Sequence, residues 1–262
     1  MSYSQIEVSS QDNITTIRLN RPAQLNSFTE VLCSEVQDAL THADSDSSIR
    51  CICLTGAGKA FSAGQDLAEI GLESDNPKDL CEILENNINP IILKIRECAT
   101  PVVAAVNGVA AGAGANLALA CDMVVATRAA KFLQAFRHVG LLPDAGGTWL
   151  LPRLAGQARA TGMAMLGEPV SAQQAEQWGL IWQCVDDDQF TQTVLDLCRK
   201  LATGPGLALG LAKKAMMDSQ NNSLSEQLQL ERDFQQAASS SDDYREGVQA
   251  FLQKRKPEFK GS

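Results

Sequence analysis

The chain has 262 residues, of which 45% are hydrophobic and 20% charged, and its formal net charge is −9. This composition is typical of a soluble globular protein with enough apolar material for a complete core, so the fold needs no disulfide or metal to hold it. The acidic balance and the lack of a long basic run argue against nucleic acid as a partner.

The first part of the chain alternates strand-like and helix-like stretches. Asp12 and Asn13 separate the first two strands and predict a hairpin turn. Alternating strands and helices predict an α/β core with both sheet faces covered. We expect strands at 6–8, 14–19, 50–55, 101–106 and 123–126, and helices at 29–43, 80–98, 112–120 and 148–154.

After about residue 155 the strand signals almost stop. Ser171 and Asp242 are expected helix N-caps, and Pro205 suits a first helical turn. We therefore expect a core of residues 1–200 and a helical C-terminal region of residues 201–262, without a linker between them. The predicted helices of this half are 158–166, 171–178, 190–203, 205–218, 224–238 and 242–254.

Cysteine usage and the N-terminus indicate the compartment. The eight cysteines form no CxxC pair and no zinc-type spacing, which is typical of core residues in a reducing compartment. The first residues lack a signal-peptide pattern, and no apolar run reaches membrane-spanning length. We expect a cytoplasmic protein that binds neither a metal nor a membrane. The basic cluster Lys254-Arg255-Lys256 either contacts a small polyanion or belongs to a solvated tail.

Several common catalytic motifs are missing. The chain has two histidines, His42 and His138, and no GxSxG motif for a nucleophilic serine. It also has no GxxxxGK[ST] loop and no GxGxxG fingerprint, which argues against nucleotide hydrolysis and hydride transfer.

Two loops rich in small residues each follow a buried strand, at 59–67 and 107–116. Small side chains let a ligand approach the backbone closely, and free amides at a helix start favour an oxyanion. Each loop could direct one N–H group at a thioester oxygen. The residues alone leave a second interpretation open, in which both loops are tight turns that allow close helix–sheet packing.

These loops and three further motifs resemble the crotonase (enoyl-coenzyme A hydratase/isomerase) superfamily over nearly the whole chain. The resemblance rests on Asn20-Arg21-Pro22 with Asn26, on residues 56–67 and 101–108, on Cys121-Asp122, and on residues 140–148. It implies a spiral of ββα units, a helical C-terminal region that oligomerises or covers the active site, and a homotrimer or dimer of trimers. It also implies acyl-coenzyme A substrates, with coenzyme A as part of the substrate and no separate cofactor.

Motif matching assigns site residues. The resemblance implies that the amides of Ala63 and Ala113 form the oxyanion hole, and that Lys254 contacts a phosphate, on its own or a neighbouring subunit. It implies that the other substrate-binding positions are Gln24, Gly64, Gln65, Asp66, Leu67, Gly112, Asn116 and Phe136.

The carboxylates indicate the reaction. Family hydratases hold water with two glutamates, at positions that are Asn116 and Phe136 here, and neither residue can act as a general base. Asp144 stands where family isomerases carry one acid, so we interpret it as the proton-transferring group; the alternative is a helix N-cap. Apolar neighbours such as Phe136 should raise the pKa of Asp144.

Two neighbours keep open roles. Asn116 either forms a hydrogen bond with the substrate or Asp144, or pairs with the free backbone groups at the start of the helix. His138 is either structural or part of the site. Residues 140–153, 178–183, 230–233 and 241–247 carry a narrower resemblance, to the ring-epoxide isomerases of phenylacetate catabolism. These convert ring-1,2-epoxyphenylacetyl-coenzyme A to an oxepin and can shift double bonds. The alternatives are a Δ3-Δ2 enoyl-coenzyme A isomerase, an enoyl-coenzyme A hydratase and a catalytically inactive crotonase-fold binding protein.

Overall fold

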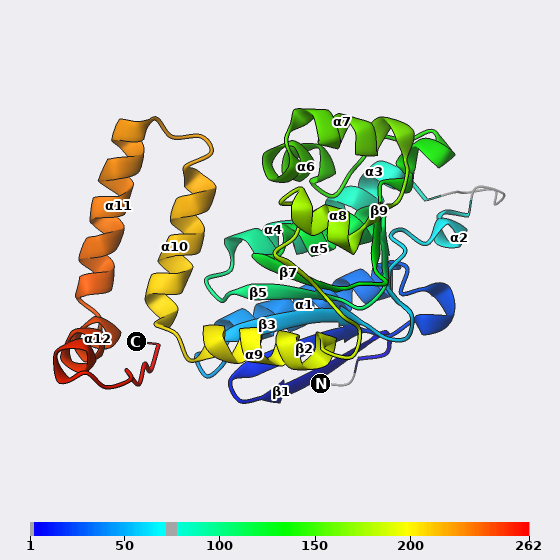
Figure 1. The fold of residues 1–262 in the computed structure, drawn as a ribbon. Coiled ribbons are helices and arrows are strands. Elements are labelled where there is room, and N and C mark those ends of the chain that lie inside the picture. Colours follow the sequence, from blue (N-terminus) through cyan, green and yellow to red (C-terminus); the bar gives the residue numbers. More distant parts are fainter. Residues whose placement is uncertain (1–2, 72–77, 262) are drawn as a thin grey trace.

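The computed structural model describes residues 3–71 and 78–261, and Figure 1 shows a layered α/β body with a helical arm at its side. The larger sheet is parallel except for the antiparallel hairpin of its first two strands. It has the strand order β1 (Ile6–Gln11), β2 (Ile14–Leu19), β3 (Cys51–Gly56), β5 (Val102–Val106), β7 (Met123–Thr127) and β10 (Gln183–Val185).

The short strands that follow β3, β5 and β7 in the chain belong to a second, smaller sheet. It consists of β4 (Ala60–Ser62), β6 (Val109–Ala111), β8 (Lys131–Leu133) and β9 (Val170–Ser171), of which only β9 runs antiparallel. The chain thus passes from β3 to β4, from β5 to β6 and from β7 to β8, and each pair leads into helices. This repeated step is the predicted spiral of ββα units, and the predicted α/β fold is confirmed.

Helices cover both faces of the larger sheet because its central strands alternate between two apolar layers. Ile52 and Leu54 face one cluster and Cys51 and Cys53 face the other. The first cluster lies under α1 (Glu30–Ser45), α4 (Asn89–Glu97) and α5 (Ala113–Ala120), and the second lies under α9 (Phe190–Ala202).

Most predicted helices are present, with shifted ends. The helix expected at 80–98 is α3 (Leu80–Ile83), a π-helical turn (Leu84–Ile88) and α4 in one run, and Pro90, which lacks an N–H donor, lies in the first turn of α4. The other helices that precede α9 are α2 (Leu67–Ile70), α6 (Gly147–Ala155), α7 (Gln157–Leu166) and α8 (Ala172–Gln177). The chain also forms 3₁₀ turns at Pro22–Gln24 and at Ala135–Val139, and the second of these is η3.

The chain beyond α9 forms an arm of three helices, α10 (Gly206–Asp218), α11 (Leu224–Ser239) and α12 (Asp242–Gln253). Figure 1 shows α10 and α11 standing side by side and away from the sheets.

Ser171 caps α8 as predicted, in a full capping box. Ser241, rather than the predicted Asp242, caps α12, and Pro205 precedes the first turn of α10 instead of lying in it.

Candidate active site

Asn26 fixes the loop that follows β3. The side chain is fully buried, and its Nδ2 donates to the carbonyls of Ala57 (2.9 Å) and Ala60 (2.8 Å). Its Oδ1 accepts a hydrogen bond from the backbone N–H of Arg21 (2.9 Å). Because those carbonyls flank the start of β4, one amide side chain holds the backbone that leads to Gln65.

Two backbone N–H groups at the end of this loop and the start of α5, those of Gln65 and Ala113, have no hydrogen-bond partner among the described residues. The first donors of a helix have no intrahelical acceptor, which accounts for Ala113. The backbone of Gly64 accepts a hydrogen bond from Phe28 (2.7 Å), and Asp66 donates one to Phe28 (3.0 Å). Extended backbone alternates its donors, so the Gln65 N–H points away from Phe28.

Gly64 brings these two amides together. A Cβ atom on Gly64 would lie 2.8 Å from the carbonyl oxygen of Ala111 and 3.1 Å from the amide nitrogen of Ala113. With a φ of +86°, Gly64 also has a backbone conformation that other residues rarely adopt. Glycine is therefore required where the loop after β4 passes the start of α5.

The prediction that the Ala63 amide faces the substrate is wrong. Its N–H donates to the carbonyl of Leu25 at 2.9 Å and is not available to an oxyanion. The N–H of Gln65 lies two residues further along the first loop. It and the N–H of Ala113 in the second loop are among the amides without a partner in the described residues. The pairing with Leu25 is a tertiary contact that the local pattern of small residues does not reveal.

Phe136 provides an apolar wall beside the start of α5. The side chain is almost fully buried, and its Cζ would lie 3.7 Å from a Cβ atom placed on Gly112. Gly112 has a φ of +54° and immediately precedes Ala113. The aromatic ring therefore packs over the backbone that immediately precedes the amide of Ala113.

Asp144 lies between η3 and α6. Its Oδ1 is buried and has no hydrogen-bond partner among the described residues. Burial raises the pKa of this carboxyl to about 6, against the smaller opposing effect of its own backbone N–H. The N-cap interpretation is wrong, because α6 begins at Gly147 after Gly146 and no side chain caps it. The start of α6 therefore does not use the carboxyl group of Asp144.

Asn116 and His138 make contacts within the protein. The Asn116 Nδ2 donates to the main-chain carbonyl of Asp144 at 2.8 Å, so the predicted contact with Asp144 exists, through backbone rather than the carboxyl group. His138 Nε2 lies 3.0 Å from the carbonyl oxygen of Gly167, which ties η3 to the end of α7. This contact is a structural one.

The predicted coenzyme A contacts lie on several elements. Gln24 and Leu67 are exposed near the first loop. The carboxylate of Asp66 is engaged with Arg21 (2.9 Å) and Ser27 (3.1 Å), so it shapes the loop. Lys254 ends α12 on the arm, which Figure 1 shows far from α5 and α6. Contacts of these residues with coenzyme A remain predictions.

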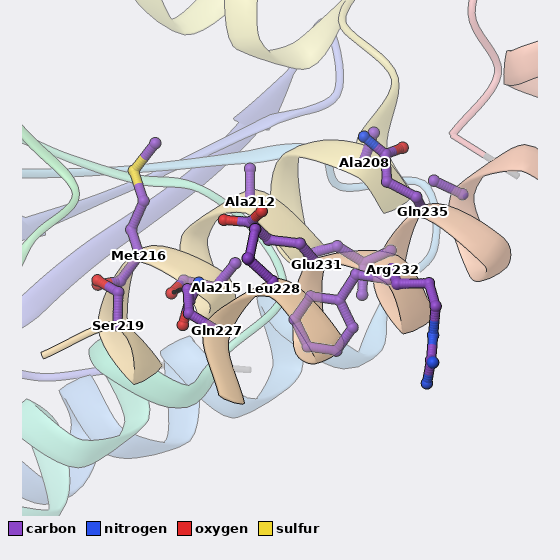
Figure 2. A pocket seen from close by; sticks show the side chains of 13 residues that line it. Ala208, Ala212, Ala215, Met216, Ser219, Gln227, Leu228, Glu231, Arg232 and Gln235 are labelled. Atoms are coloured by element: carbon purple, nitrogen blue, oxygen red, sulfur yellow. Dashed lines mark hydrogen bonds between the residues drawn. The ribbon is translucent and has the colours of Figure 1, made fainter. Parts of the chain in front are cut away.

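The arm carries a groove of about 690 Å³ between α10 and α11. Figure 2 shows its lining side chains, among them Ala212, Met216 and Leu228, which all come from these two helices and their junction. Asp144, Gln65 and Ala113 do not line it. The groove is therefore separate from the polar groups assembled around α5.

Within residues 3–71 and 78–261, no group of three or more His, Cys, Asp or Glu side chains could hold a metal ion. In the same ranges, no helix has both the length and the apolar character needed to cross a membrane.

With this fold and this site, the chain belongs to the enoyl-CoA hydratase/isomerase family, which it matches over residues 9–262. The predicted resemblance is confirmed, and the chain is an enzyme of that family. It is 50% identical over 252 residues, 96% of each chain, to 1,2-epoxyphenylacetyl-CoA isomerase of Escherichia coli strain K12. It is 45% identical over 261 residues, 100% of each chain, to a probable enoyl-CoA hydratase of Rhodobacter capsulatus.

Solved structures agree. The crystal structure of an enoyl-CoA hydratase subunit I from Geobacillus kaustophilus superposes with a TM-score of 0.91, at 35% sequence identity and 99% coverage of both chains. At this identity and coverage the likeness extends over the spiral and the helical arm together.

Proposed function

We propose that the chain is an acyl-coenzyme A isomerase in which Asp144 moves a proton between carbons of the acyl group. The observation that carries this proposal is the buried Oδ1 of Asp144, which has no hydrogen-bond partner among the described residues, in a carboxyl group whose pKa is raised to about 6. A carboxyl group of that pKa exchanges protons efficiently near neutral pH.

The amides of Gln65 and Ala113 would hold the thioester oxygen. Hydrogen bonds to that oxygen make the neighbouring C–H acidic and stabilise the enolate that forms when the proton leaves. The Asp144 carboxylate takes this proton, and the resulting acid returns it to a carbon further along the conjugated system. Because the substrate gains and loses no atoms, the reaction is an isomerisation.

The two residues that replace the glutamates of family hydratases argue against hydration. Asn116 is buried with its amide engaged by protein groups, and Phe136 is apolar. Neither side chain can remove a proton from water. A hydratase would need another acid at this point, so we expect water addition to be slow.

For the acyl group we propose ring-1,2-epoxyphenylacetyl-coenzyme A, converted to its oxepin isomer. In this conversion the ring C–C bond that carries the epoxide oxygen breaks as the ring double bonds rearrange, and the proton taken from the carbon beside the thioester returns to a ring carbon. The 50% identity to 1,2-epoxyphenylacetyl-CoA isomerase supports this choice, and the Phe136 wall suits an apolar ring. The alternatives are a Δ3-Δ2 enoyl-coenzyme A isomerase, a hydratase of fatty-acid oxidation and an inactive binding protein. The buried Oδ1 of Asp144, which no described residue engages, favours an enzyme over the inactive binding protein.

Replacing Asp144 with asparagine tests the mechanism, because it preserves shape and removes the base. We expect turnover of the ring epoxide and of a β,γ-enoyl thioester to fall roughly a hundredfold or more, with thioester affinity nearly unchanged. Product formation by chromatography and affinity by calorimetry measure the two effects. The exposed Asp188→Asn serves as matched control. Near-normal turnover by D144N, or faster hydration of an α,β-enoyl thioester than isomerisation by the wild type, contradicts the proposal.

We also propose that the arm joins copies of the chain into a trimer or a pair of trimers. Phe251 and Leu252 on α12 are 83% and 74% exposed, which is unfavourable for large apolar side chains in water. Sedimentation should show a trimer or hexamer that Phe251→Ser with Leu252→Ser dissociates. A wild-type monomer at micromolar concentration contradicts this assembly.

A further inference from the structure

The main-chain carbonyl of Asp144 accepts two hydrogen bonds. One comes from the N–H of Gly147 (2.7 Å) and closes a four-residue turn, and the other comes from Asn116 Nδ2 (2.8 Å). The two central residues of this turn, Ala145 and Gly146, have φ values of +48° and +77°. Alanine is disfavoured at such an angle, because its Cβ crowds the backbone. The turn that carries Asp144 is thus strained and receives support from outside.

Gln134 orients the amide of Asn116. Its Nε2 donates to Asn116 Oδ1 at 2.8 Å, and Asn116 Nδ2 lies 3.4 Å from Gln134 Oε1. Both side chains are completely buried. Because the oxygen of Asn116 is held by Gln134, its NH₂ group must face the Asp144 carbonyl. The amide pair ties the turn to α5 and to the junction of β8 and η3.

The packing leaves the turn no alternative position. A Cβ atom on Gly147 would lie 2.4 Å from Asn116 Nδ2, so the backbone of the turn rests directly on the amide. With the carbonyl of Asp144 held inward by two donors, the side chain of the same residue leaves the backbone in a fixed direction. That direction places Oδ1 in a buried position, where no described residue gives it a hydrogen bond.

From this geometry we propose that Asn116 and Gln134 are positioning residues, whose buried amide pair holds the strained turn and so aims the Asp144 carboxyl at the acyl group. The inference rests on the proposed function of Asp144. It assigns a role to Gln134 and explains why an amide suits position 116, where a carboxylate would lack the N–H donor that the Asp144 carbonyl needs.

Charged groups on the neighbouring elements are engaged elsewhere. On η3, Arg137 donates to the carbonyls of Met165 and Leu166, and His138 contacts Gly167. On α6 and α4, the guanidinium groups of Arg153 and Arg96 lie over the Trp149 ring, at 4.1 and 5.8 Å from its centroid. None of them contributes to the raised pKa of Asp144, which follows from burial. A change in that pKa therefore reports how the turn is held.

The test replaces Asn116 with leucine, which is similar in volume and cannot donate. We expect kcat to fall roughly ten- to hundredfold with KM within about twofold, since binding through Gln65 and Ala113 is retained. The looser turn admits water, so the pKa of Asp144 should move from about 6 towards 4, as measured by NMR of carboxyl-labelled aspartate without substrate. The exposed Asn221→Leu is the matched control.

Two further variants separate positioning from general stability. Gln134→Met should change kcat and the pKa of Asp144 in the same direction, and the double variant N116L/Q134M should be no worse than N116L, because both remove one support. Ala145→Gly in the N116L background should restore part of kcat, since glycine relieves the left-handed strain. If N116L does not fold, the kcat of Q134M and the pKa of Asp144 in that variant decide whether the amide pair positions Asp144.

Folded N116L or Q134M with wild-type kcat and an unmoved Asp144 pKa overturns the inference. If D144N keeps its turnover, the proposed function fails instead, while the NMR titration still shows whether the amide pair controls Asp144. The two failures are thus distinguishable.

Discussion

Asp144 has a pKa of about 6 in the folded chain, above its ordinary value of 3.8, because burial disfavours the charged form. Below pH 3.8 the group is protonated in both the folded and the unfolded chain and contributes nothing. Between these two values the unfolded chain ionises first, so the folded state loses stability as the pH rises. Above pH 6 the loss is constant, at about 2–3 kcal/mol for a shift of this size.

Asp144→Asn should therefore stabilise the fold while it lowers turnover roughly a hundredfold or more. Urea unfolding at pH 8 should give the variant a free energy of unfolding up to about 2–3 kcal/mol above the wild type, and the gap should close as the pH falls from 6 to 4. Exposed Asp188→Asn should show no such dependence. A gap that is equal at pH 4 and pH 8 would mean that Asp144 is not held in an ionised, desolvated state.

Sequence reasoning singled out Asp144 and Ala113, because both follow recognisable motifs. The Asp144 Oδ1 and the Ala113 N–H have no partner among the described residues, and their catalytic roles stay predictions. It missed the Gln65 amide and chose Ala63, since the direction of an N–H group depends on which distant strand it pairs with. It also missed Gln134, which is buried against Asn116 but stands 18 residues away in the chain. Both features depend on contacts between residues that are far apart in the chain, and a local sequence pattern does not reveal such contacts.

At the scale of elements, the long strands and helices were predictable and the short strands were not. β3 and β5 are continuous apolar runs, and the β1–β2 hairpin turns at Asp12 and Asn13 as expected. β4, β6 and β8 have three residues each, too few to show alternation, and they exist because they pair with one another. This small sheet brings the two predicted loops to one place.

Gly114 permits that approach, since a Cβ atom there would lie 2.6 Å from the carbonyl oxygen of Ser62 on β4. Gly114→Ala should lower the free energy of unfolding by about 1–3 kcal/mol, because the clash outweighs the gain of about 1 kcal/mol that alanine brings to a helix. Gly162→Ala on α7 meets nothing within 4 Å and should raise stability by about 0.5–1 kcal/mol. Equal effects of the two substitutions would show that β4 and α5 can separate.

At the scale of the whole molecule, few polar contacts connect the arm to the body. Lys213 on α10 donates to Asp122 (2.9 Å) and to the carbonyl of Ile95 (2.7 Å). Arg153 on α6 bonds to Gln220 after α10 (3.1 Å). None of the residues of α10 or α11 is fully buried. The arm is therefore held at defined points rather than by a continuous core.

Lys213→Met should loosen this attachment. The Lys213 side chain is 8% exposed, so its loss leaves Asp122 charged, largely buried and without its cation, which typically costs about 3–5 kcal/mol. Burial already raises the pKa of Asp122, and without Lys213 that pKa rises further. The loss of stability should therefore shrink as the pH falls and Asp122 takes up a proton.

Lys213→Met with Asp122→Asn should recover much of the loss. Thermal unfolding between pH 5 and 8, with limited proteolysis at residues 203–205, measures both effects against exposed Lys214→Met. A defect independent of pH, or no recovery in the double variant, would show that packing rather than the ion pair holds the arm.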